Sequence, residues 1–192
     1  MMNATKYNLP MLLTWLRVVL IPVFVLIFFV HSSSVLWQNY LATFVFILAS
    51  VTDWFDGFLA RRLNQTSDFG AFLDPVADKL MITAALILLV YLHRTSPIVA
   101  IIIVSREIAI SALREWMAQV GKRKSVAVAY IGKIKTTVQM IAVVILLIYE
   151  IPYLHLRLHN IGNVFMWIAC ILTLWSMFHY ISLAVKQLKE SK

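Results

Sequence analysis

The sequence predicts an all-α membrane protein: a bundle of six transmembrane helices in one domain over residues 1–192, with both termini in the cytoplasm. Three observations predict this fold. Of the 192 residues, 61% are hydrophobic and only 14% charged, a composition too apolar for a water-soluble domain. Six apolar stretches have roughly the length of about 20 residues that a spanning helix needs. Lysines and arginines gather at alternate ends of these stretches, as the positive-inside rule expects.

The six predicted helices run over residues 9–30, 37–62, 72–92, 97–118, 126–149 and 160–184. The first is longer than the apolar region of a signal peptide and is interrupted by Arg17, so we interpret it as a helix. Gly70 is expected in the turn before the third helix, and Pro75 fits there if Asp74 is close to the N-cap. When the spans alternate in direction, fourteen of the seventeen Lys and Arg residues fall on one side, which is therefore predicted to be cytoplasmic.

The charge balance excludes several other classes of protein. A net charge of +8 could indicate nucleic-acid binding, but basic residues between long apolar runs are typical of a membrane orientation signal, and we predict no nucleic-acid partner. The single cysteine, Cys170, excludes a disulfide framework. We therefore expect the scarce charged residues to carry the function.

The negative charge is concentrated in one short segment. All five aspartates lie within residues 53–78, at the predicted cytoplasmic ends of the second and third helices. Asp53 and Asp56 are three residues apart, and Asp74 and Asp78 four apart, so each pair lies on one face of its helix. Carboxylates at membrane depth are costly unless neutralised. Four of them in one cavity suit two Mg²⁺ or Mn²⁺ ions.

Small residues beside these carboxylates indicate a phosphate ligand. Gly57 and Ala60 continue the face of Asp53 and leave room for a ligand against the backbone. Arg61 follows with a guanidinium that can bind phosphate oxygens in a fork. The pattern therefore predicts a metal-bridged pyrophosphate site at the membrane surface.

The segment resembles the signature of the CDP-alcohol phosphatidyltransferase family, without a gap or a substitution. The matching positions are Asp53, Asp56, Gly57, Ala60, Arg61, Gly70, Asp74 and Asp78. Residues 8–17, 70–79, 106–108, 111–116 and 132–137 also resemble bacterial members that use glycerol 3-phosphate, so the resemblance covers nearly the whole chain. Met11 stands where many members of the broader family carry Asn.

The resemblance implies an activity and a location. CDP-diacylglycerol would donate its phosphatidyl group to sn-glycerol 3-phosphate, giving phosphatidylglycerol phosphate and CMP in phospholipid biosynthesis. The protein would be a multi-pass homodimer among the lipids of the bacterial inner membrane, with its active site facing the cytoplasm.

The resemblance also implies the role of each site residue. Asp53, Asp56, Asp74 and Asp78 would hold two metal ions, and Asp78 would also act as the general base. The residues expected to bind CDP-diacylglycerol are Asp53, Asp56, Gly57, Ala60, Arg61, Gly70 and Thr14.

Four cations on the fourth and fifth predicted helices indicate an anionic acceptor. They are Arg106, Arg114, Lys133 and Lys135. The alternative interpretation is that the last three extend to lipid headgroups, but Arg106 lies too deep for this. We therefore predict that the set binds glycerol 3-phosphate.

Other functions stay open at this point. The same chemistry could use serine, inositol phosphate or phosphatidylglycerol as the acceptor. An ion-coupled transporter would also place carboxylates in the membrane, but it leaves the pattern of Gly57, Ala60, Arg61 and Gly70 unexplained. A structural scaffold would have to retain four carboxylates without chemistry.

Overall fold

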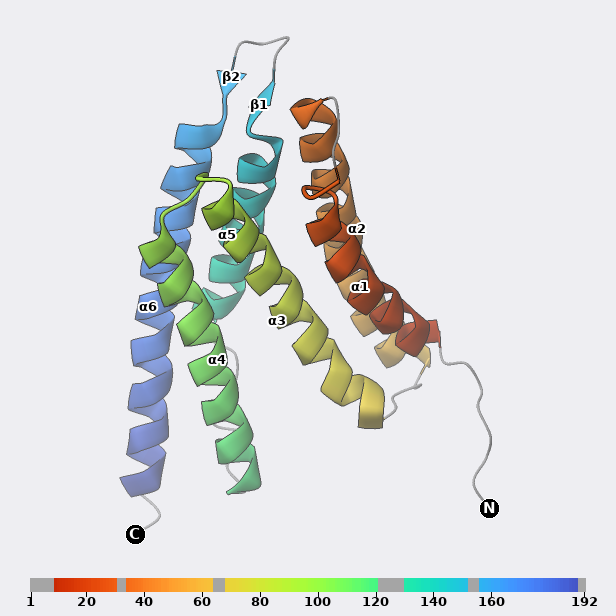
Figure 1. The fold of residues 1–192 in the computed structure, drawn as a ribbon. Helices are drawn as coiled ribbons and strands as arrows, with labels where there is room; N and C mark the ends of the chain where they lie inside the picture. Colours follow the sequence, from red (N-terminus) through yellow and green to blue (C-terminus); the bar gives the residue numbers. More distant parts are fainter. Residues whose placement is uncertain (1–8, 31–33, 64–67, 121–129, 152–155, 190–192) are drawn as a thin grey trace. The chain divides into compact units, whose positions relative to one another are not determined.

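The computed structural model describes residues 9–30, 34–63, 68–120, 130–151 and 156–189 (Figure 1). These residues form six helices and one pair of very short strands. The elements are α1 (Leu9–Leu26), α2 (Val35–Leu63), α3 (Asp68–Tyr91), α4 (Pro97–Gln119), α5 (Tyr130–Ile148), β1 (Glu150–Ile151), β2 (Leu156–Arg157) and α6 (His159–Lys189). The prediction of six helices is confirmed, and most ends lie within a few residues of those expected.

The strand pair is one departure from an all-helical chain. β1 and β2 are antiparallel, with Glu150 opposite Arg157 and Ile151 opposite Leu156. They lie in the connection between α5 and α6, where backbone N–H and C=O groups outside the helices need other partners. Longer strands are identified in a sequence by alternating apolar and polar residues, and two residues are too few to show this alternation. The strand pair could therefore not be predicted from the sequence.

The third helix begins earlier than expected. We expected Gly70 in a turn and Pro75 near the N-cap, but α3 begins at Asp68 and both residues lie inside it. The expectation was wrong because a proline inside a helix removes only one hydrogen bond, which a membrane helix tolerates when other groups satisfy the released carbonyl.

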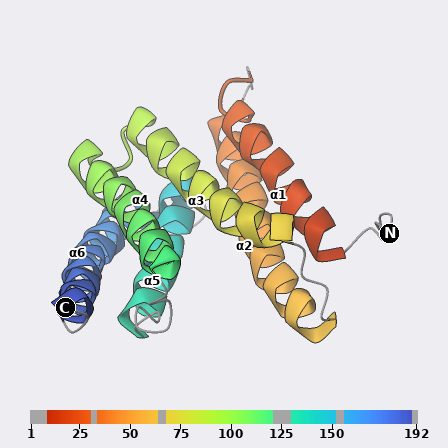
Figure 2. The same ribbon diagram turned by 90° about the horizontal axis from the view of Figure 1, so that it is seen from below.

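The chain divides into two compact units, Met1–Leu88 and Leu89–Lys192, and each is described by itself. In the first unit, α1 packs along α2, as Figures 1 and 2 both show. The rings of Phe24 on α1 and Phe46 on α2 are 6.0 Å apart, centroid to centroid. Ala42 and Ala49 are fully buried on α2, and small residues of this kind let membrane helices approach closely.

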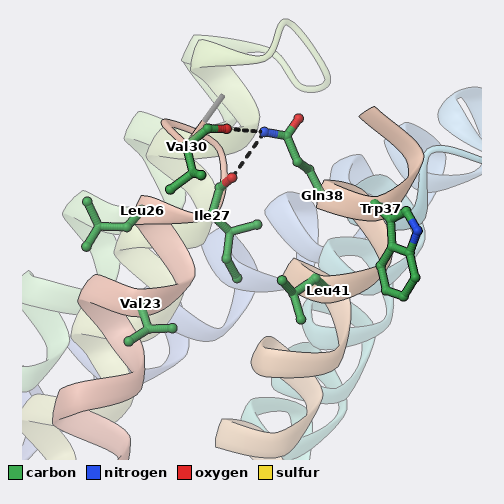
Figure 3. Close-up of a pocket in the computed structure, with 7 residues that line it drawn as sticks. All are labelled: Val23, Leu26, Ile27, Val30, Trp37, Gln38 and Leu41. Carbon is green, nitrogen blue, oxygen red and sulfur yellow. Dashed lines mark hydrogen bonds between the residues drawn. The ribbon is translucent and has the colours of Figure 1, made fainter. Parts of the chain in front are cut away.

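An apolar pocket of about 360 Å³ lies between the end of α1 and the start of α2 (Figure 3). Gln38 is one of its lining residues, and its Nε2 donates to the carbonyls of Ile27 at 3.1 Å and Val30 at 2.9 Å. These carbonyls follow the last turn of α1, where no helical partner remains. The helix ends at Leu26 instead of continuing to residue 30, and Gln38 satisfies the carbonyls released there.

In the second unit, α6 packs against both α5 and α4. Gly162 on α6 is buried, and a Cβ placed on it would lie 2.7 Å from Leu146 on α5, so α5 and α6 approach too closely for a larger residue. Nearer the C-terminal end of α6, Tyr180 and Ala184 form a buried cluster with Ile110 and Met117 of α4.

Arg94 stabilises one end of the second unit. It is buried, and its NH1 donates to the carbonyls of Leu146 at 3.2 Å and Leu147 at 2.9 Å, in the last turn of α5. Its guanidinium lies 4.5 Å from the centre of the Tyr149 ring. Burial lowers the pKa of Arg94, but guanidinium remains charged in proteins. A cation is favourable at this negative end of a helix dipole.

Two helices in the described residues are long and apolar enough to cross a membrane. These segments are Val35–Asp53 within α2 and His159–Lys186 within α6. Leu12–Leu26 and Ile134–Ile148 are shorter apolar segments. Large apolar side chains such as Phe44, Trp175 and Phe178 are exposed on the helix surfaces, as expected for residues that face lipid.

Candidate active site

The signature residues lie on two helices of the first unit. α2 carries Asp53, Asp56, Gly57, Ala60 and Arg61, and α3 carries Gly70, Asp74 and Asp78. Both segments are helical throughout, so residues three or four apart in each aspartate pair have the spacing of neighbours along one helix face. The side chains of Asp56, Ala60 and Arg61, and the surroundings of Gly57, lie outside the described part of the structure.

The first helix contacts one carboxylate from each of these two helices. The NH1 of Arg17 lies 2.6 Å from Oδ1 of Asp53 on α2. The hydroxyl of Thr14 donates to Oδ1 of Asp74 on α3 at 2.5 Å. Thr14 and Arg17 are one helical turn apart and each is only 1% exposed. α1 therefore places two buried polar groups against the acidic helices.

The carboxylates of Asp53 and Asp74 both contact one turn of α1, through Arg17 and Thr14 respectively. Asp53 remains 42% exposed despite its contact with Arg17, so its oxygens are accessible to a ligand. Hard oxygen donors of this kind suit Mg²⁺ or Mn²⁺.

The complete metal set predicted from the sequence is not visible in the described residues. Among these residues, no group of three or more His, Cys, Asp or Glu side chains could hold a metal ion. The Asp56 side chain, one of the four predicted ligands, is outside them. Asp78 and Gly70 lie on α3, with Asp78 half-buried and Gly70 buried.

The predicted acceptor residues belong to the second unit. α4 carries Arg106 and Arg114, and α5 carries Lys133 and Lys135. Arg106 and Lys135 are buried and Arg114 is half-buried. The side chain of Lys133 is not among those that the structure describes. Arg106 and Arg114 interact electrostatically with each other and with Lys135. The structure therefore brings three of the four predicted cations together.

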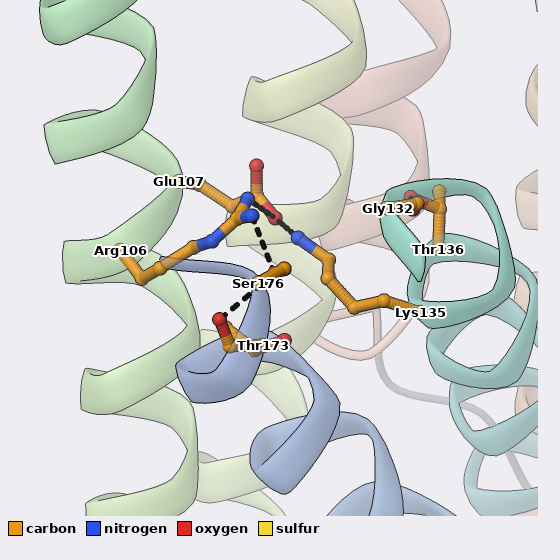
Figure 4. A network of polar contacts seen from close by, with 7 residues as sticks. All are labelled: Arg106, Glu107, Gly132, Lys135, Thr136, Thr173 and Ser176. Carbon is orange, nitrogen blue, oxygen red and sulfur yellow. Dashed lines mark hydrogen bonds and ion pairs between the residues drawn. The ribbon is translucent and has the colours of Figure 1, made fainter. Parts of the chain in front are cut away.

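The carboxylate of Glu107 lies between two of these cations, Arg106 and Lys135 (Figure 4). Glu107 forms an ion pair and hydrogen bond with Lys135, and its Oε1 is 3.5 Å from NH1 of Arg106. On the other side, NH2 of Arg106 donates to the hydroxyl of Ser176 at 2.7 Å, and this hydroxyl donates to the carbonyl of Thr173 at 2.9 Å. The network joins α4, α5 and α6.

Sequence reasoning missed three residues of these sites. Arg17 was given no role in the site, and neither Glu107 nor Ser176 was singled out. Arg17 and Glu107 carried a usable signal, since a charged residue within an apolar helix usually has a partner. Ser176 carried none, because a serine in a membrane helix is also common as a packing residue.

Comparison with known proteins identifies the family. The model of the CDP-alcohol phosphatidyltransferase family matches residues 7–175, which is most of the chain. The chain belongs to this family. CDP-alcohol phosphatidyltransferases are membrane-embedded enzymes that generally use divalent metal ions.

Individual family members are similar over nearly their whole length. A protein of Pectobacterium atrosepticum is 51% identical over 189 residues, covering 96% of this chain and 99% of that protein. Proteins of Escherichia coli K12 and Shigella flexneri are each 49% identical over 181 residues, covering 93% of this chain and 96% of each relative. All three are named CDP-diacylglycerol–glycerol-3-phosphate 3-phosphatidyltransferase.

Proposed function

We propose that this CDP-alcohol phosphatidyltransferase transfers the phosphatidyl group of CDP-diacylglycerol to sn-glycerol 3-phosphate, giving phosphatidylglycerol phosphate and CMP. Three relatives at about half identity carry the name of this reaction. They support glycerol 3-phosphate over serine, inositol phosphate or phosphatidylglycerol as the acceptor.

The observation that carries the choice of acceptor is an excess of positive charge around Arg106. In the described network, Arg106, Arg114 and Lys135 are opposed by one carboxylate, that of Glu107. Two positive charges are left, and unpaired charge is costly at membrane depth. A phosphate monoester carries about −1.5 to −2 at neutral pH and would balance them. Serine is neutral overall and would not.

The first unit would supply the catalytic groups. Asp53, Asp56, Asp74 and Asp78 are the proposed ligands of two divalent ions, Mg²⁺ or Mn²⁺, which when bound would stabilise charge on the pyrophosphate. Gly57, Ala60 and Gly70 would leave room for the nucleotide and phosphates, and Thr14 would lie beside them. Arg61 would hold phosphate oxygens with its planar guanidinium.

The transfer itself needs one proton acceptor. Asp78 would take the proton from the acceptor hydroxyl while the hydroxyl oxygen bonds to the phosphatidyl phosphorus. The bond from that phosphorus to the oxygen of CMP breaks, and CMP leaves with the bonding electrons. The other protein groups position the reactants and stabilise charge, as is general in phosphoryl transfer.

The membrane arrangement is part of the proposal. All six helices would span the bacterial inner membrane as one domain over residues 1–192, in a homodimer. Both termini and the active site would face the cytoplasm, because fourteen of the seventeen Lys and Arg residues fall on that side when the spans alternate.

The test is an acceptor screen with the purified protein. CDP-diacylglycerol is supplied with glycerol 3-phosphate, serine, inositol phosphate or phosphatidylglycerol, and CMP release is measured with Mg²⁺, with Mn²⁺ and with a chelator. We expect release with glycerol 3-phosphate alone, and loss of release on chelation. Release with another acceptor but not with glycerol 3-phosphate would refute the proposed specificity.

A further inference from the structure

The polar residues of α1 face the acidic helices although the rest of the helix is strongly apolar. Thr14 and Arg17 are buried, whereas Leu12, Leu16 and Val19 are exposed. A long cationic side chain in a membrane helix often extends to the headgroups. Arg17 does not follow this pattern, since its guanidinium is 1% exposed and contacts Asp53.

This contact has an electrostatic consequence for the metal site. Asp53 and Asp74 carry like charges and contact neighbouring positions of α1, so without a cation the carboxylate faces of α2 and α3 would tend to separate. Arg17 supplies a positive charge 2.6 Å from Asp53, and Thr14 donates a hydrogen bond to Asp74.

We propose that Arg17 is a positioning residue that neutralises Asp53 in the metal-free protein and weakens the binding of the divalent ion there. The ion would have to share Asp53 with a cation already in contact with it. Arg17 thus stabilises the arrangement of the carboxylates before metal binds, at the expense of metal affinity. The inference rests on the proposed metal site, and it adds a residue on a third helix that regulates that site.

The test compares full-length wild-type protein with Arg17→Met, which keeps an apolar stem of similar length but removes the charge. Mn²⁺ alone is the probe, and its free concentration is followed by electron paramagnetic resonance. We expect Arg17→Met to bind Mn²⁺ about tenfold more tightly, the effect of removing one nearby unit charge even where water screens it. Without metal, its Tm should fall by at least about 4 °C, and the rise in Tm produced by Mn²⁺ should be larger than in wild type.

Arg94→Met is the matched control. Arg94 is also a buried arginine, and its described hydrogen bonds go to backbone carbonyls of α5. This variant should lose thermal stability while its Kd for Mn²⁺ stays within about twofold of wild type, because the carbonyls that Arg94 binds belong to α5 and not to the proposed metal site.

The outcomes separate this inference from the proposed function. If wild-type protein neither binds Mn²⁺ nor gains stability from it, the proposed metal site is wrong. If wild type binds Mn²⁺ but Arg17→Met binds it equally or more weakly, the inference alone is wrong. Should Arg17→Met unfold without metal, we expect saturating Mn²⁺ to restore the fold, and failure to do so would also overturn the inference.

Discussion

Arg106 offers the most direct test of the acceptor site. Its guanidinium is 5% exposed and donates through NH2 to Ser176, while NH1 is 3.5 Å from Glu107, too far for a good hydrogen bond. The Nε has no hydrogen-bond partner in the part of the chain that the structure describes. Arg106 therefore has donors left for a phosphate group. We predict that Arg106→Gln weakens glycerol 3-phosphate binding selectively.

The expected size follows from the contact that is lost. A hydrogen bond from a charged donor contributes about 1.5 to 3 kcal/mol, which corresponds to about a 10- to 150-fold rise in KM for glycerol 3-phosphate. Interactions made equally in the bound substrate and the transition state change KM and leave kcat nearly constant. The KM for CDP-diacylglycerol should not change, because Arg106 has no part in the proposed nucleotide site.

Steady-state CMP release, with each substrate varied in turn, measures these constants. Arg94→Gln is the control, since Arg94 is also 5% exposed in the same unit but contacts the carbonyls at the end of α5. It should lower the Tm and leave both KM values unchanged. The reasoning is refuted if Arg106→Gln is folded and keeps a wild-type KM for glycerol 3-phosphate, or if both KM values rise together.

Three further predictions concern other residues. Asp78→Asn should lower kcat by at least about 100-fold through loss of the general base, and near-normal turnover by a variant that still binds Mg²⁺ and CDP-diacylglycerol would contradict that role. Glu107→Gln should lower the KM for glycerol 3-phosphate, because the cluster of Arg106 and Lys135 loses its negative charge, and should lower the Tm, because Lys135 loses its counter-ion. An increased KM in kinetic assays would argue against the charge balance. Gly162→Ala should lower the free energy of unfolding by about 1 to 3 kcal/mol, because the added methyl group overlaps Leu146. Thermal unfolding measures this, and an unchanged Tm would mean that α5 and α6 can move apart without loss of stability.

The helical fold could be predicted from the sequence because each helix carries its own signal. Long apolar stretches and the turns between them depend on local composition, and α2, α4 and α6 begin within two residues of the predicted starts. The end of α1 was not predictable in this way, because it depends on Gln38 from the next helix. The position of Pro75 inside α3 likewise depends on how the surrounding helix tolerates a missing N–H group.

The same distinction applies to the candidate sites: the spacing within one helix could be predicted from the sequence, and the contacts between helices could not. Spacing alone indicated that Asp53 and Asp56, or Asp74 and Asp78, share a helix face, because helix geometry fixes neighbours three and four residues apart. It could not indicate which side chain from another helix would meet them. The partners of Asp53 and Asp74 come from residues 36 and 60 positions away in the sequence, on α1.

The sequence by itself therefore determined the membrane character, the six helices and the residue types that carry charge, since these follow from local composition and short-range periodicity. Only the tertiary structure decided how the charges are paired: Arg17 with Asp53, Thr14 with Asp74, and Glu107 with Lys135. The physical reason is that scarce charges in apolar helices must find partners, and those partners are chosen by the packing of whole helices.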